Sequence, residues 1–329
     1  MREKYLDAVC GIMIVWMIVG HIINSCGLIE SRFYVLGNHM LPFFMPWFFF
    51  KSGMLYKGKV DFLTLMKRGG VRLLVPYSVF CIGTFILFDL GSLSNNGFSG
   101  CLKSFFFQLY YTGAPSHNVA LWFLLTLFLV KLIFSLLIRQ LNSSLVIFIA
   151  GLLSVVVFMV YHHTCILANY KLPYYFMNAV TGLFFYACGV LLKELQFMKH
   201  VIITSLIIHC IVLIFCYSFV DMFKNDLLQG SYILWLLSSI TGCVIVNNIF
   251  RKLSKNIDFP LLNYIGRNSM TFLLIHLWLI IIIKGRLLPV LQVYDPYYCF
   301  ILMIIACIIV IPIVNWILHT KYLKWMIGE

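Results

Sequence analysis

The sequence is poor in charged residues. Only 11% of its 329 residues are Asp, Glu, Lys or Arg, whereas 62% are hydrophobic. Soluble domains carry about 25% charged residues on average, so this composition excludes an ordinary soluble globular protein. What remains is a series of apolar runs of about 18 residues or more, each long enough for a helix to cross a bilayer. Solid apolar blocks, in place of alternating segments of about ten residues, also exclude a transmembrane β-barrel.

Long polar stretches are missing as well, so there is no room for a soluble catalytic domain. We therefore predict an all-α fold, a polytopic membrane helix bundle that forms a single domain over residues 1–329. Ten transmembrane helices are expected, at residues 8–26, 37–56, 73–90, 119–138, 144–161, 174–192, 200–220, 231–249, 266–284 and 299–318.

Acidic residues are few, and the formal net charge is +13. If ten spans place both termini on one side, that side carries sixteen Lys and Arg residues and the other carries six. This bias predicts that both termini are cytoplasmic. It explains the basicity by topology and contact with anionic membrane lipids, and no nucleic-acid partner is expected. The expected location is the plasma membrane, which in a bacterium is the inner membrane, with multiple passes.

The eleven cysteines include no Cys-x-x-Cys pair and lie mostly in apolar runs. This pattern does not fit a disulfide framework or a zinc site, so no metal site is expected. No internal repeat is visible, and the first apolar run lacks a signal-peptide cleavage site, so it is expected to be retained as a helix. Residues 91–118 are rich in glycine and serine and are expected to form a mobile loop that acts as a lid.

The first apolar run carries a histidine, His21. Asp7, Cys10, Met17 and His21 fall on one stripe of a helix, and the eleven residues from Cys10 to His21 span about 16 Å. A titratable side chain inside a membrane segment is costly and is by default a candidate functional group. An imidazole also suits general-base chemistry near neutral pH. The alternative is a buried histidine that is hydrogen-bonded by a neighbouring helix.

Short motifs recur in order along the chain and together resemble the acyltransferase 3 family, integral-membrane enzymes that acylate sugars. The matching segments are Tyr5-Leu6-Asp7 with Gly11 and Gly20-His21, then Phe44 to Gly53, Arg68 to Tyr77, Leu121 to Leu124, and Tyr264 to Ser269 with Ile275-His276. Each motif is short and loose alone. Five in the correct order make the resemblance specific.

The resemblance implies a mechanism in which the histidine of the first helix, here His21, activates an acceptor hydroxyl. It further implies an acyl-CoA donor, normally acetyl-CoA, that arrives from the cytoplasm as a co-substrate and not as a bound cofactor. Arg68 and Arg72 match the basic entry to the third span and are expected to contact the CoA phosphates. The implied acceptor is a glycan or a lipid-linked sugar.

The chain departs from the family pattern at two positions. Cys10 stands where the family usually has Arg or Lys, and Phe44 stands where it has a second histidine. His39 lies about 140° round a helix from position 44 and is a poor substitute. Lys51 replaces an apolar residue of the family motif at a similar expected depth to Cys10, so we expect it to supply the missing cation. The alternative is a lysine that snorkels to the inner interface.

Three other polar or aromatic residues, Asp7, Trp122 and His276, each allow two interpretations. Asp7 either orients a cation or stabilises the helix start, and Trp122 either stacks on a sugar or belongs to an interfacial aromatic belt. His276 either makes a structural hydrogen bond or contacts substrate, and Ser52 is a supporting residue of the second motif. Snorkelling to the inner interface explains Lys131.

These patterns favour an acyl-CoA-dependent O-acyltransferase, most simply an O-acetyltransferase, that modifies a hydroxyl of a cell-surface or lipid-linked glycan. A transporter or flippase of a lipid-linked sugar is the alternative from another class, but such proteins often show related repeats. A third reading, based on Cys10 and Phe44, is an acyltransferase-like protein that has lost catalysis.

Overall fold

The computed structural model describes residues 3–58, 61–163 and 173–329, and of residues 92–96 and 162–163 it describes the backbone alone. The chain is 80% helical with almost no strand, as predicted. The helical elements are α1 (Lys4–Cys26), α2 (Arg32–Met40), α3 (Phe44–Met54), α4 (Phe62–Gly69), the π-helix η1 (Gly70–Leu74), α5 (Val75–Leu87), η2 (Asp89–Ser92), α6 (Leu93–Thr112), η3 (Ser116–Leu121), α7 (Trp122–Leu137), α8 (Ser143–His163), α10 (Tyr174–Leu195), α11 (Lys199–Phe215), α12 (Tyr232–Leu253), α13 (Pro260–Arg267), α14 (Ser269–Ile282), the π-helix η4 (Ile283–Leu287), α15 (Leu288–Val290), α16 (Pro296–Leu318) and η5 (Lys324–Ile327).

Within the described residues, eight helical stretches are long and apolar enough to cross a membrane. Two of the ten predicted spans fall short of that length. The predicted span 37–56 is divided into α2 and α3 by the turn around Pro42, and each part is shorter than a bilayer crossing. The predicted span 200–220 corresponds to α11, which has 17 residues. The count of ten and the side of the termini stay predictions.

The expected loop at residues 91–118 is helical instead. Residues Leu93–Thr112 form α6, with a kink at Gly97 where φ is 64°, and η3 follows it. The glycines and serines cluster in the first part of this segment, whereas Cys101 and Phe105 further on are buried against the bundle. Burial of this apolar face outweighs the turn-forming composition, so the prediction of a mobile loop was wrong.

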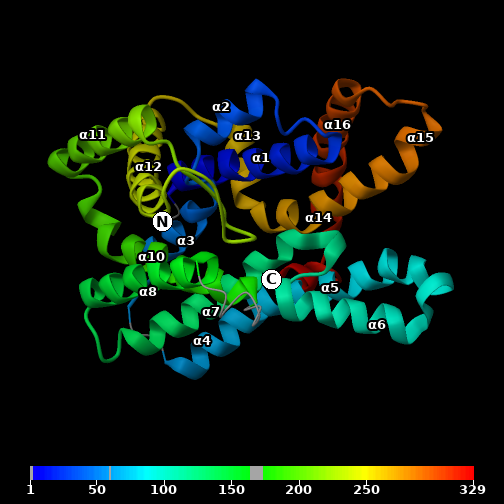
Figure 1. Ribbon diagram of the computed structural model, residues 1–329, viewed down its shortest axis with the longest axis horizontal. Helices are drawn as coiled ribbons and strands as arrows, with labels where there is room; N and C mark the ends of the chain where they lie inside the picture. Colours follow the sequence, from blue (N-terminus) through cyan, green and yellow to red (C-terminus); the bar gives the residue numbers. More distant parts are fainter. Residues whose placement is uncertain (1–2, 59–60, 164–172) are drawn as a thin grey trace.

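Helix α1 lies at the centre of the bundle and packs against α3, α12, α13, α14 and α16 (Figure 1). Its contact with α13 is backbone to backbone. A methyl group at Gly11 would collide with the carbonyl group of Leu262, and one at Gly266 would collide with that of Asp7. Helices α3 and α10 approach in the same way through Gly53 and Gly189. These four glycines fix two close helix pairs in a membrane bundle, where small residues permit tight packing.

A short hairpin interrupts the helical architecture between α11 and α12. Its strands β1 (Phe219–Asp221) and β2 (Asp226–Gln229) pair antiparallel, with Val220 opposite Leu227. In Figure 1 this hairpin, in yellow-green, reaches from α12 toward the middle of the molecule. Together with α2 it lies over the end of α1 that carries His21.

Candidate functional site

His21 lies in the wall of a cavity of about 430 Å³. The residue is partly buried near the end of α1, and Met17, one turn before it, lines the same cavity. We call this cavity the His21 chamber. It is bounded by α1, α2, the start of α3, η3, the start of α7, Leu273 of α14 and the β1–β2 hairpin. The chamber exposes one imidazole among aromatic, amide, aliphatic and charged side chains.

The aromatic walls come from three sides. Trp16 stacks on Tyr34 at a centroid distance of 6.0 Å, and both line the chamber. Trp122 lines the opposite side and is 4% exposed, so it belongs to the chamber and not to the membrane interface. Phe44 also lines the chamber, which means that the position of the family's second histidine faces this space. His39, by contrast, stacks on Tyr217 at 3.4 Å and is not part of the lining.

Two amide side chains add hydrogen-bonding groups to the chamber. Asn24 follows His21 by three residues on the same face of α1, and Asn38 lies on α2. Amides both donate and accept hydrogen bonds, so they suit recognition of hydroxyl groups.

The hairpin supplies the chamber's charged groups, Asp221 and Lys224. The backbone N–H of Phe223 donates to Oδ1 of Asp221 at 3.0 Å, which holds the turn between the strands. Asn178 of α10 donates from Nδ2 to the carbonyl oxygen of Phe223 at 3.0 Å and anchors the same turn to the bundle. Burial raises the pKa of Asp221 above its usual value, although the backbone hydrogen bonds and Lys224 act in the opposite direction.

His276 of α14 lies directly behind His21. The two ring centroids are 5.2 Å apart, and His276 is fully buried. Its Nδ1 lies 2.9 Å from the carbonyl oxygen of Phe272. A carbonyl only accepts, so Nδ1 carries the proton and Nε2 of the neutral ring is an acceptor. Among the described residues no hydrogen-bond partner is found for Nε2.

A break in the helix before α7 directs Trp122 into the chamber. Asn118 has non-helical backbone angles within η3, and its Nδ2 donates to the carbonyl oxygen of Leu274 at 3.0 Å. This bond ties η3 to α14 next to His276. Val119 and Ala120, which follow Asn118, line the chamber.

At the other end of α1, Asp7 is paired with Arg267. Nε of Arg267 lies 3.3 Å from Oδ2 of Asp7, and the side chains are 51% and 3% exposed, respectively. Arg267 ends α13, the helix that packs tightly on α1. Cys10, one turn along α1, is 1% exposed. A cation therefore does lie near the Asp7 end of the α1 stripe, but it comes from α13.

Lys51 is held against an aromatic ring. Its Nζ lies 5.2 Å from the centroid of the Trp47 ring, a cation–π contact. Trp47 is itself fixed, because Nε1 donates to Oδ1 of Asn247 at 2.9 Å and Asn247 donates to Gln196 at 3.0 Å. Ser52 beside it is partly buried and does not line the chamber.

Arg68 lies at the end of α4 and Arg72 in η1, both are exposed, and neither lines the chamber. The π-helix places Arg72 next to α7, because η1 packs against that helix. Gly328 near the C-terminus packs on the backbone of Arg72 and covers this turn.

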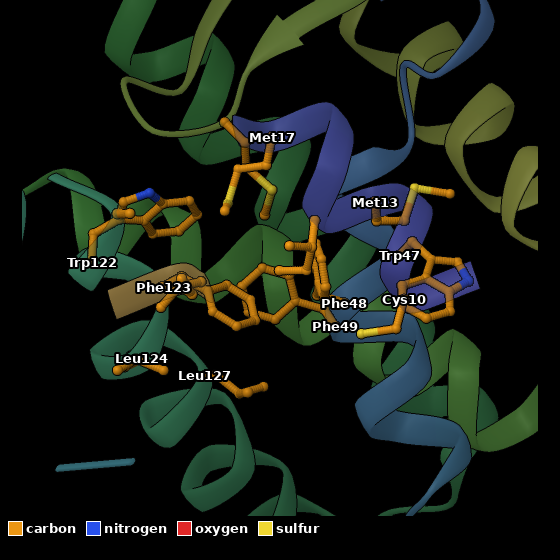
Figure 2. Close-up of a cluster of buried hydrophobic side chains, with 14 of the residues drawn as sticks. Cys10, Met13, Met17, Trp47, Phe48, Phe49, Trp122, Phe123, Leu124 and Leu127 are labelled. Carbon is orange, nitrogen blue, oxygen red and sulfur yellow. The ribbon is translucent and has the colours of Figure 1, made fainter. Parts of the chain in front are cut away.

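An apolar layer separates the chamber from these basic residues. Phe123, which lines the chamber, has its ring centroid 5.6 Å from Phe48 and 5.1 Å from Phe49. Figure 2 shows these rings of α3 and α7 meeting in the middle of the cluster, with Met17 of α1 nearby. We call Met17, Phe48, Phe49 and Phe123 the chamber floor.

The residues expected from the sequence thus fall into two groups. His21 and Trp122 meet at the chamber, with His276 behind His21, whereas Asp7, Lys51, Arg68 and Arg72 lie away from its lining. Sequence reasoning missed the chamber residues Asn24, Tyr34 and Asn38 and the hairpin. Asn24 carried a usable signal, since it shares a helical face with His21. Within the described ranges, no three His, Cys, Asp or Glu side chains are grouped closely enough to hold a metal ion.

Comparison with known proteins agrees with the motifs. No curated protein and no solved structure matches the chain. A family model described as an acyltransferase domain matches residues 3–320, which is nearly the whole chain. The chain is therefore a membrane acyltransferase and belongs to the acyltransferase 3 family.

Proposed function

We propose that this protein is an acyl-CoA-dependent O-acyltransferase, in the simplest case an O-acetyltransferase, that modifies a hydroxyl of a cell-surface or lipid-linked glycan in the plasma membrane. The observation that carries the proposal is the His21 chamber. It combines one imidazole with amide groups and aromatic faces in about 430 Å³. This volume falls in the range of small-molecule sites, which are about 300–1,000 Å³.

His21 is the general base in this proposal. Its imidazole takes the proton of the acceptor hydroxyl as the hydroxyl oxygen attacks the carbonyl carbon of the acyl thioester. The tetrahedral intermediate then collapses, the C–S bond breaks, and the CoA thiolate leaves. The imidazolium returns its proton to that thiolate, so the products are the ester and CoA. His276 is a positioning residue, because its ring lies 5.2 Å from that of His21 but outside the chamber lining.

The acceptor side of the proposal rests on the chamber lining. Sugars present hydroxyl groups at the edge of the ring and C–H groups on its faces. Asn24 and Asn38 suit the hydroxyl groups, and the faces of Trp16 and Trp122 suit the C–H groups. The nearby hairpin charges favour a polar acceptor over a hydrocarbon one.

The donor side rests on charge. Arg68 and Arg72 are exposed at the end that the positive-inside bias assigns to the cytoplasm, and Lys51 lies in the last turn of α3, whose first turn lines the chamber. Phosphate groups of acyl-CoA suit such cations. The thioester reaches His21 only if the chamber floor parts, because Phe48 and Phe123 are in contact.

Acetylation of the surface glycan in a deletion strain tests the proposal. The strain is complemented with the wild type, with His21→Ala or with His21→Gln, and glycan O-acetyl content is measured. We expect the wild type to restore acetylation and both variants to reduce it by at least about 100-fold, since a positioned general base contributes about 10²–10⁴-fold. Membrane extracts are assayed for variant protein in the same cells, and the purified wild type is tested for transfer of labelled acetyl groups from acetyl-CoA.

Two results overturn the proposal. Full acetylation by a well-expressed His21→Ala variant removes His21 as the base. Loss of the exported glycan itself in the deletion strain, with the remaining glycan normally acetylated, favours transport instead.

A further inference from the structure

Lys131 lies on the protein-facing side of α7. It follows Leu124 by seven residues and Leu127 by four, which places it within about 40° of both on the helix. Leu124 and Leu127 are 1% and 6% exposed. Leu136, which is 50% exposed, lies about 140° round the helix from Lys131. The side chain is therefore directed toward the bundle, and snorkelling along a lipid-facing surface does not account for it.

The charged neighbour of Lys131 is another cation. Arg72, in the π-helix η1, interacts electrostatically with Lys131, and η1 packs against α7. Gly69, three residues before Arg72, contacts the ring of Phe128 in the same part of α7. Among the described residues no ion pair is recorded for either Lys131 or Arg72. Lys131 is partly buried and Arg72 is exposed, and two neighbouring cations repel each other unless an anion lies between them.

The position of Lys131 relates it to the chamber. Helices α3 and α7 both begin at the chamber, with Phe44 and Phe123, and both run away from it. Lys51 follows Phe44 by seven residues and Lys131 follows Phe123 by eight, which is about 10–12 Å of helix. Along both helices, the floor contact between Phe48 and Phe123 lies nearer the chamber than either lysine does. Counted from that contact, Lys51 lies three residues further along α3, about 4.5 Å, and Lys131 lies eight residues further along α7, about 12 Å. Both helices therefore carry a cation on the side of the floor away from the chamber, and Lys131 is the more distant of the two.

We propose that Lys131 is a donor-binding residue that, together with Arg72, binds the phosphate groups of the acyl-CoA co-substrate. This inference rests on the proposed function for the identity of the donor. The phosphates neutralise the Lys131–Arg72 pair at the inner end of α7. The uncharged pantetheine arm then extends along Leu127 and Leu124 toward the floor, and the thioester lies nearest His21.

Binding of CoA to the purified protein in nanodiscs tests this inference. The variants are Lys131→Met and Lys131→Arg, with Lys252→Met as the matched control, because Lys252 is exposed in the last turn of α12 on the same predicted face. We expect Lys131→Met to weaken CoA binding by at least about 10-fold, since charge-assisted phosphate contacts are strong. Lys131→Arg should stay within about threefold of the wild type, and Lys252→Met should bind normally. Pantetheine lacks phosphates, so its affinity, measured by competition, should be the same for the wild type and Lys131→Met.

The outcomes separate this inference from the proposed function. If Lys131→Met binds CoA as tightly as the wild type, Lys131 does not bind phosphate and the inference is wrong. The inference is also wrong if Lys131→Met loses as much affinity for pantetheine as it loses for CoA. If Lys131→Met loses CoA affinity but the wild type acetylates no glycan, the inference stands and the proposed function fails. If the wild type binds no CoA, the proposed donor and this inference fail together.

Discussion

His21 and His276 face each other across the contact between α1 and α14, with their ring centroids 5.2 Å apart. The two residues are far apart in the chain, and the packing of α14 against α1 brings their rings together. The Phe272 carbonyl fixes the proton of His276 on Nδ1 and leaves Nε2 as an acceptor. We expect this acceptor beside His21 to favour the His21 tautomer in which the basic nitrogen faces the chamber.

Removal of His276 should therefore impair the chemical step more than substrate binding. We expect His276→Ala to lower kcat by about 10–100-fold, as loss of an orienting partner commonly does, and to leave the KM of the acceptor within about threefold. Steady-state kinetics of the purified variant measure both. His209→Ala is the control, since His209 is also buried but bonds to Ser238 and Thr241 away from the chamber lining. An unchanged kcat in His276→Ala would exclude a role for His276 in positioning His21.

Trp122 should contribute to acceptor binding. Its ring lines the chamber and is 4% exposed. Aromatic contacts contribute about 0.5–1.5 kcal/mol beyond burial, so Trp122→Ala should raise the acceptor KM by about 3–10-fold, while Trp122→Phe retains most of the affinity. Acceptor titration at saturating acyl-CoA measures this. Trp316→Ala, at a position 75% exposed on α16, should behave like the wild type. Equal effects at Trp122 and Trp316 would assign Trp122 to general membrane packing.

The helical spans could be predicted because a helix must have a minimum length to cross a bilayer, and the length of an apolar run can be counted directly in the sequence. The stripe from Asp7 to His21 could also be predicted, because the 3.6-residue periodicity of a helix fixes which residues of one segment share a face. Prediction failed where contacts with other helices determine the secondary structure of a segment. Residues 93–112 have the glycines and serines of a loop, but α6 buries Cys101 and Phe105. One expected span is divided at Pro42, and its first part, α2, lines the chamber.

Contacts between distant segments had no local signal at all. Asp7 and Arg267 come from opposite ends of the chain, and only the packing of α13 on α1 brings them together. The same holds for the hairpin, whose strands of three and four residues are too short to stand out in a sequence. Asn24 was within reach of sequence reasoning, because it shares the face of His21.

The α1–α13 contact should tolerate no added side chain at Gly266. A methyl group there would meet the carbonyl oxygen of Asp7, which belongs to backbone and cannot move without shifting α1. We expect Gly266→Ala to lower the free energy of unfolding by about 1–3 kcal/mol, the usual cost of overpacking, and to disturb the Asp7–Arg267 pair. Thermal unfolding in detergent measures the loss. Gly285→Ala is the control, because a methyl group there meets nothing within 4 Å; if both variants unfold at the same temperature, the close approach is not limiting.

The stability of the hairpin should depend on pH through Asp221. Burial raises the pKa of this carboxyl above its usual value of 3.8, so the folded protein holds the proton to a higher pH than the unfolded chain does. Where the folded state binds more protons, stability falls as pH rises. The free energy of unfolding should therefore decrease from pH 3.8 up to the raised pKa and then level off. Asp221→Asn should remove this part of the pH dependence, because an amide does not titrate and its Oδ1 still accepts from the Phe223 N–H. Thermal unfolding at pH 4 to 7 compares the two proteins, and parallel curves for wild type and Asp221→Asn would mean that Asp221 is not the titrating group.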